Sequence, residues 1–298
     1  EFMGMDPIES YQDTLQKIIY NNNPWADIIP KPEDYDRMSL ERSFAIYNEI
    51  FGNAHGMHFT FVGNINPDEA KPLLEKYLGS LPASPKENSY KDVGLRLLKG
   101  STYIAIKRGK ESQARLNLFF EGETEYNRDN RMHLAALIEV LNIKIIEKLR
   151  EDMSGMYGGG LRGSVSKRPY EHFSITGSIP CGPENVEKLT NALLEIIKTA
   201  QEKGIEQKDL DKVKETWKKQ YHVQLQNNDF WLTSLSNAFI NQDDPENILD
   251  YEEKVNEITK EDLQAAAQKF FTLNNRVKAV MYPESSTMKE EVKTLKGF

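Results

Sequence analysis

Residues 127–183 read NRDNRMHLAALIEVLNIKIIEKLREDMSGMYGGGLRGSVSKRPYEHFSITGSIPCGP, and this stretch decides the fold. Apolar residues recur at helical spacing from Asn127 onward, so the pattern predicts a long helix that ends near Asp152. The runs at 156–166 and 171–179 then predict two strands. A long helix followed at once by a strand pair is the centre of the domain.

The flanking segments extend this pattern on both sides. Alternating apolar runs at 101–106 and 114–120 predict two strands before the helix. After Pro183 comes a helical series that is interrupted at Gly204, at 227–228 and at 243–245. The order of strands, helix, strands and helices predicts an α+β fold, with a mainly antiparallel sheet and helices packed on one face.

The first part of the chain is mostly helical. It contains helical patterns at 9–21, 38–51 and 66–78, a strand-like run at 57–63 and a Pro-containing linker at 82–88.

An internal repeat relates the two ends of the chain. Segments 39–63 and 259–283 align without gaps at an offset of 220 residues. Each begins with a hydroxyl residue and an acidic first turn, and each runs through a helical pattern to an aromatic before a strand-like run. The repeat predicts a duplicated domain in which Phe51 and Phe271 occupy equivalent core positions.

The repeat also predicts the domain boundaries. We expect residues 8–84 to be the C-terminal part of a truncated domain and residues 85–298 to be a complete copy, so the first copy is incomplete. Residues 1–7 (EFMGMDP) have neither a basic region nor an apolar core, and they resemble a cloning remnant rather than a signal peptide. We expect segments 11–63 and 231–283 to share one helix-helix-strand arrangement.

Composition excludes several classes of protein. The 298 residues include 38 Lys and Arg against 46 Asp and Glu, and a net charge of −8 argues against a nucleic-acid partner held by bulk positive charge. Hydrophobic residues make up 39% of the chain, which suffices for a core. The run 134–141 is interrupted by Glu139 and is too short to span a membrane. The single cysteine, Cys181, excludes an internal disulfide framework.

The chain contains no complete catalytic motif. None of the five histidines begins an H-x-x-E-H pair, and in the similar run RPYEH at 168–172 an Arg replaces the first His and Pro169 breaks the helix that the ligands need. His55 and His58 have a spacing that suits zinc but no further ligand nearby. We therefore predict no metal site in this chain, and Cys181 and the triplet at 158–160 offer neither a catalytic base nor a phosphate loop.

One pair of residues could serve chemistry. Arg150 closes the long helix, and its guanidinium suits carbonyl or carboxylate oxygens. Tyr157 follows at the head of the glycine-rich strand, and its hydroxyl can donate to an oxyanion. Both would point toward one opening, where an extended peptide could pair with the strand backbone. An Arg that complements the helix dipole and a Tyr that packs in the core are the alternatives.

Several runs resemble the C-terminal half of pitrilysin- and insulysin-type zinc metallopeptidases, the inverzincins. They are Leu149 to Tyr157, Pro180 to Val186, Phe61 to Asn64 and Glu75 to Pro82, with Asn227 to Leu232 and Tyr282 to Glu284 similar to the long bacterial members. The resemblance covers most of residues 8–284. It implies four homologous α+β domains in two halves that enclose a peptide chamber.

The resemblance also implies a role for this chain. Zinc belongs to the N-terminal half of such a protein, so this fragment would form the chamber wall and be inactive alone. Arg150 would hold the substrate backbone, and Tyr157 would be catalytic by stabilising the oxyanion across the chamber. The implied partners are a peptide substrate and the zinc-bearing half, on the same or a partner chain, and the implied location is the periplasm.

Two other interpretations stay open. The chain could belong to a catalytically inactive member that serves as a structural or partner-binding subunit, as the core subunits of a respiratory complex do, although the presence of Arg150 and Tyr157 argues against it. An unrelated α+β binding module would require the repeat and every matching run to be coincidence.

Overall fold

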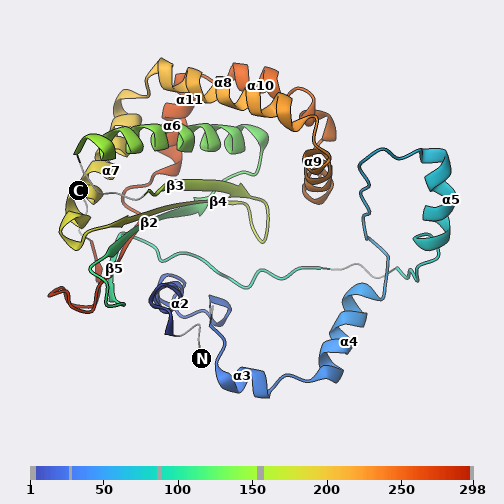
Figure 1. Ribbon diagram of the computed structural model, residues 1–298, viewed down its shortest axis with the longest axis horizontal. Coiled ribbons are helices and arrows are strands. Elements are labelled where there is room, and N and C mark those ends of the chain that lie inside the picture. Colours follow the sequence, from blue (N-terminus) through green and yellow to red (C-terminus); the bar gives the residue numbers. More distant parts are fainter. Residues whose placement is uncertain (1–4, 27–28, 86–88, 153–157, 296–298) are drawn as a thin grey trace. The chain divides into compact units, whose positions relative to one another are not determined.

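The computed structural model describes residues 5–26, 29–85, 89–152 and 158–295 (Figure 1). The chain forms two compact units. Unit 1 consists of Glu1–Ile29, Asp92–Thr216 and Val255–Phe298, and unit 2 consists of Pro30–Lys91 and Trp217–Lys254.

Unit 1 is built on one mixed sheet. Its strands are β1 (Thr102–Lys107), β2 (Ala114–Glu123), β3 (Gly160–Ser166), β4 (His172–Cys181), β5 (Val277–Tyr282) and β6 (Glu291–Thr294). Their order across the sheet is β3-β4-β2-β5-β1-β6, with β1 and β5 parallel and the other neighbours antiparallel. The α+β class and the mainly antiparallel sheet are confirmed.

Three helices cover one face of this sheet: α6 (Arg128–Asp152), α7 (Val186–Lys203) and α11 (Lys260–Phe270) (Figure 1). The side-chain oxygen of Asn127 accepts a hydrogen bond from the amide of Asn130 at 2.8 Å, which starts α6 where the sequence predicts. Gly204, at φ 75°, ends α7. Edge-to-face aromatic pairs join helix to sheet, with ring centroids 5.0 Å apart for both Phe120–Phe271 and Phe173–Phe270.

A fourth helix, α2 (Pro7–Ile19), lies on the opposite face of the sheet. Its buried stripe is Tyr11, Leu15 and Ile19, which packs on Ile104, Ile106, Val277, Ala279 and Met281 of β1 and β5. The Tyr11 hydroxyl donates a hydrogen bond to the side-chain oxygen of Asn117 in β2 at 2.9 Å. The sequence pattern predicts helices on one face only, because periodicity reveals the buried side of α2 but not the surface that receives it.

Unit 2 is helical. It holds η3 (Pro245–Ile248), α3 (Pro32–Asp36), α4 (Leu40–Phe51), α5 (Pro67–Tyr77) and α9 (Asn228–Asn241). The end of α8 (Gln207–Gln224) and the start of α10 (Tyr251–Glu257) also belong to it.

The predicted strand at 57–63 is wrong. Residues 57–62 have no regular secondary structure and pair with no strand in the described part of unit 2, and a strand requires a neighbour for its ladder hydrogen bonds. The run lies instead along α9. The His58 ring stacks on Phe239 with centroids 3.6 Å apart, and the Ser236 hydroxyl lies 3.3 Å from that of Thr60.

The order of elements follows the 220-residue offset. Along it α2 corresponds to α9, η1 (Pro24–Ala26) to η3, α3 to α10, and α4 to α11. Asn22 and Gln242, at φ 53° and 58°, are left-handed at matching positions. In each copy of the repeat, the first helix packs on the other copy. α2 of the first copy packs on β5 of the second copy, in unit 1, and α9 of the second copy lies along residues 57–62 of the first copy, in unit 2.

Burial differs between the two copies. Phe271 is 1% exposed, whereas Phe51 at the matching position is 59% exposed. The predicted core position of Phe51 is therefore wrong for this structure. The physical reason is that α11 packs on a sheet, and the described residues of unit 2 provide none to α4.

Candidate functional site

The two predicted site residues lie at the junction between α6 and β3. Arg150 is in the last turn of α6, and its side chain is outside the described part of the chain. Tyr157 lies outside the described residues altogether. Their roles stay predictions, and the structure defines the elements on either side of them.

A glycine run leads into β3. Gly158 and Gly159 have φ of 117° and 118°, a conformation that favours glycine. A Cβ on Gly159 would lie 2.6 Å from the backbone oxygen of Ser178, so the chain approaches β4 too closely for any side chain. β3 then forms the outermost strand beside β4.

Asn142 fastens α6 to the start of β3. Its side-chain nitrogen donates to the carbonyl oxygen of Leu161 at 2.9 Å, and its side-chain oxygen accepts from the amide of the same residue at 2.8 Å. A Cβ on Gly160 would lie 2.7 Å from the Asn142 oxygen, which explains the third glycine. The sequence reasoning missed Asn142, although a lone Asn between Leu141 and Ile143 in an apolar stretch was an available signal.

The sheet face opposite α6 is polar along β3 and β4. The strand register places alternate residues on this face: Arg162, Ser164 and Ser166 of β3 and His172, Ser174, Thr176 and Ser178 of β4. The hydroxyls of Ser164 and Ser174 lie 3.3 Å apart, and Arg115 of β2 donates to the Ser178 hydroxyl at 3.4 Å. A face of hydroxyl and guanidinium groups is suited to contact with solvent or with a polypeptide backbone.

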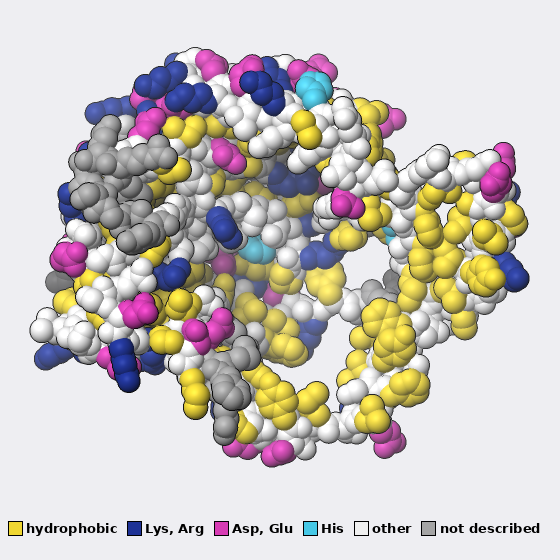
Figure 2. Space-filling view, viewed as in Figure 1, with side chains coloured by type: hydrophobic (Ala, Val, Ile, Leu, Met, Phe, Trp, Pro, Cys, Tyr) yellow, Lys and Arg dark blue, Asp and Glu magenta, His cyan; other side chains and the backbone are white. Residues whose placement is uncertain are grey.

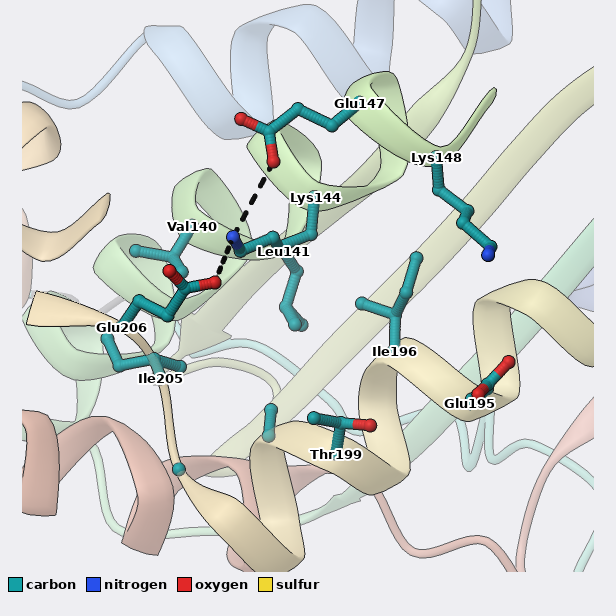
Figure 3. Close-up of a pocket in the computed structure, with 12 residues that line it drawn as sticks. Val140, Leu141, Lys144, Glu147, Lys148, Glu195, Ile196, Thr199, Ile205 and Glu206 are labelled. Atoms are coloured by element: carbon teal, nitrogen blue, oxygen red, sulfur yellow. Dashed lines mark hydrogen bonds and ion pairs between the residues drawn. The ribbon is translucent and has the colours of Figure 1, made fainter. Parts of the chain in front are cut away.

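A cavity of about 320 Å³ lies between α6, α7 and the segment that leads into α8 (Figure 3). Its apolar lining consists of Val140, Leu141, Ile196, Ala200 and Ile205. Lys144 reaches over it from α6, and its amine lies 2.6 Å from a carboxylate oxygen of Glu206, 2.8 Å from Asp209 and 3.5 Å from Glu147.

The charges around this cavity neutralise one another. Burial lowers the pKa of Lys144, but hydrogen bonds to Asp209 and Glu206 outweigh it and leave the pKa above its ordinary value. The hydrogen bond from Lys144, followed by that from Lys208, lowers the pKa of Glu206 to about 2. Since Asp209 is fully buried, its ion pair with Lys144 joins the start of α8 to α6.

The other candidate side chains are held in structural contacts. The His172 ring stacks on Tyr170 with centroids 4.3 Å apart, and its Nδ1 lies 2.7 Å from the Tyr170 carbonyl oxygen. Burial, and then Glu184, raises the pKa of the Cys181 thiol to about 11, so the thiolate is scarce at neutral pH.

The described residues contain no group of three or more His, Cys, Asp and Glu side chains arranged to hold a metal ion. No helix within the described ranges is long and apolar enough to cross a membrane.

The chain is similar to known zinc proteases. It is 23% identical over 234 residues to the probable zinc protease PqqL of Escherichia coli strain K12. The match covers 77% of this chain and 25% of that protein. The crystal structure of the periplasmic protease PqqL from Escherichia coli superposes with a TM-score of 0.81 at 21% identity, over 95% of this chain and 31% of that one. The structure of the ferredoxin protease FusC in complex with Arabidopsis ferredoxin superposes with a TM-score of 0.77 at 15% identity, and the match covers 95% of this chain and 31% of that one.

The chain spans about a quarter of the length of the curated relative and under a third of the two solved chains. The structural likeness establishes the fold. The family model described as peptidase M16 inactive domain matches residues 37–216, which is more than half of the sequence. This chain therefore belongs to the peptidase M16 inactive domain family.

Proposed function

We propose that this chain is the noncatalytic portion of a zinc metallopeptidase and forms part of the wall of its peptide chamber. The observation that carries the proposal is the match of residues 37–216 to the inactive domain, in a chain whose relatives are zinc proteases about three times its length. Zinc and the water it activates would be held by a preceding half. The polar face of β3 and β4 supports a role in lining a chamber.

Arg150 and Tyr157 are the proposed contribution of this chain to the reaction. The Arg150 guanidinium would hold substrate backbone oxygens, and the Tyr157 hydroxyl would stabilise the oxyanion that forms when water attacks the peptide carbonyl. Such donors are effective in a closed site that excludes water. Their support is the resemblance of residues 149–157 to the family, together with the position of α6 directly before the edge strand.

The proposal also concerns residues 8–84, the first copy of the sequence repeat, which we expect to be incomplete. In residues 38–77 large apolar side chains are exposed on α4 and α5, among them Phe44, Tyr47, Leu73 and Tyr77. We propose that residues 8–84 complete a domain whose other part covers these side chains, and that residues 85–298 form the following domain, as the sequence repeat predicts.

The substrate class and location follow by analogy. FusC is described in complex with a ferredoxin, and PqqL of Escherichia coli as a periplasmic protease. We propose a peptide or an unfolded protein as substrate and the periplasm as the compartment. The alternative, an inactive member that acts as a structural subunit, is favoured by no specific observation on this chain.

The test is a kinetic comparison in the full-length enzyme. Tyr157→Phe removes only the hydroxyl, so we expect kcat for peptide hydrolysis to fall about 100-fold, with KM changed little, because the bond forms chiefly in the transition state. Tyr126→Phe, in the segment before α6, is the control and should leave kcat unchanged. An unchanged kcat together with a lowered melting temperature would assign Tyr157 to packing and leave only Arg150 as a proposed substrate contact.

A further inference from the structure

Two arginines on the sheet face opposite α6 have no carboxylate partner among the described residues. Arg115 lies on β2 and Arg162 on β3. The Arg115 Nη1 donates to the Ser178 hydroxyl at 3.4 Å, while the Arg115 Nε is buried without a hydrogen-bond partner. Arg162 is exposed, and the described part of the chain gives it neither a hydrogen bond nor an ion pair. Both guanidinium groups therefore retain donors that a ligand can use.

The strand register brings the two arginine side chains toward one hydroxyl. Arg162 faces Thr176 across β3 and β4, so it is the diagonal neighbour of Ser178, two residues further along β4. Diagonal neighbours on one face of a sheet lie about 7–8 Å apart, which long side chains can span. The residue in register with Ser178 on β3 is Gly160, which has no side chain to cover the hydroxyl. Since β4 lies between β3 and β2, Ser178 is flanked by Arg162 on one side and Arg115 on the other.

Neighbouring side chains bound this site without filling it. Asn117 pairs with Ser178 from β2, is buried and accepts a hydrogen bond from the Tyr11 hydroxyl at 2.9 Å. Helix α2 therefore closes this side of the site. Glu121 lies further along β2, and its carboxylate accepts a hydrogen bond from the Tyr170 hydroxyl at 2.9 Å. That carboxylate is held at the other end of the face and does not neutralise the two arginines.

The donors around Ser178 suit a carboxylate. Guanidinium groups form short, charge-assisted hydrogen bonds with carboxylate oxygens, and a serine hydroxyl adds a further donor. Two cations that flank one hydroxyl repel each other, and an anion between them offsets this repulsion. The face continues beyond Thr176 with the hydroxyls of Ser164 and Ser174, which lie 3.3 Å apart. It can therefore contact a chain that extends past its charged residue, which favours a side-chain carboxylate over a chain end.

We propose that Arg115 and Arg162, together with Ser178, bind the carboxylate of an Asp or Glu side chain in a bound peptide and so give this chain a preference for acidic peptides. The proposal rests on the proposed function in taking a peptide as the ligand. The site consists of side chains on the sheet face and uses no main-chain group of β3. It determines specificity, whereas Arg150 and Tyr157 are proposed to contact the peptide backbone and the oxyanion.

An NMR titration of the isotope-labelled chain tests the preference. The probe is the blocked peptide Thr-Ser-Glu-Ser-Thr, and the matched peptide has Gln in place of Glu, which keeps the size and removes the charge. We expect the Glu peptide to bind at least about tenfold more tightly and to shift the Nε–Hε signals of Arg115 and Arg162, because hydrogen bonds to charged groups are stronger than neutral ones. The Gln peptide with a free C-terminus should bind no more tightly than its blocked form.

Matched variants assign the preference to these side chains. Arg162→Gln should raise the Kd of the Glu peptide about tenfold and leave that of the Gln peptide unchanged, and Arg115→Gln should act in the same way. Arg162→Lys keeps the charge but not the planar fork, so it should weaken binding less. Lys198→Gln removes an exposed cation from α7, on the other face of the sheet, and is the control that should change neither Kd. The melting temperature of each variant shows whether the fold is retained.

Three outcomes would overturn the proposal. Equal affinities for the Glu and Gln peptides would show that the face selects no carboxylate. A folded Arg162→Gln variant that keeps the preference would place the site elsewhere, and tight binding of the Gln peptide with a free C-terminus would exclude a side-chain site. Because the assay requires no zinc and no turnover, it can fail while Tyr157→Phe still lowers kcat in the full enzyme, and it can succeed when that variant is fully active.

Discussion

Lys144 is the residue on which the junction of α6 and α8 depends. Asp209 is fully buried, and it has Lys144 at 2.8 Å and the more exposed Lys212 at 3.4 Å. Lys144→Met keeps most of the packing but removes the nearer cation, so we expect the free energy of unfolding to fall by about 3 kcal/mol, as for other buried pairs that lose one partner. Urea denaturation followed by circular dichroism measures the loss.

Lys198→Met is the control for this variant. Lys198 and Glu202 form a surface pair with the charged atoms 3.7 Å apart, and such pairs contribute less than about 1 kcal/mol. An equal decrease in the free energy of unfolding for the two variants would show that burial of Asp209 does not determine how much its ion pair stabilises the fold.

Acid should weaken the same cluster. The pKa of Glu206 is lowered from 4.5 to about 2, so the folded state binds this proton less readily than the unfolded chain does. Its contribution to stability is therefore complete above pH 4.5 and is lost as the pH falls through about 2. We expect the difference in melting temperature between the unmodified chain and Lys144→Met to narrow from pH 5 to pH 2. A constant difference would contradict the coupling of these residues.

At the scale of single elements, α2 supplies the cover of the second sheet face. Leu15 is 3% exposed and packs on β1 and β5, so Leu15→Ala should lower the free energy of unfolding by about 2–5 kcal/mol. Ile8→Ala in the same helix is the control, since Ile8 is 37% exposed and its truncation should cost much less. Thermal denaturation of both variants compares them, and equal shifts would place α2 away from the core.

The elements differ in how far the sequence predicts them. Strong periodicity and caps predict α6, α7 and α11, because Asn127 and Gly204 act through local hydrogen bonds and φ values. The strand at 57–63 fails because a strand requires a partner that local pattern cannot supply. At the candidate site, the sequence places Arg150 at a helix end and shows Asn142 as a polar residue in an apolar stretch, but it does not identify Leu161, 19 residues away, as the partner of Asn142.

At the scale of the whole molecule, the exposed apolar side chains of α4 and α5 should govern solution behaviour. Hydrophobic side chains gather on the surface of both helices (Figure 2), and a large exposed apolar surface is normally covered by protein. We expect the isolated chain to self-associate as its concentration rises, and Tyr47→Lys with Phe51→Lys to weaken that association, as measured by sedimentation velocity. Val223→Lys, at a residue that is 72% exposed on α8, is the control. A monomer at every concentration would contradict the prediction.

The exchange of helices between the two copies has a consequence during protein synthesis. α2 leaves the ribosome about 260 residues before its partner strand β5. At a translation rate of 5–20 residues per second, the apolar stripe of Tyr11, Leu15 and Ile19 stays without its complete packing surface for roughly 13–52 s. Unit 1 therefore cannot finish folding before β5 has emerged, and α2 is a natural binding site for a chaperone until then.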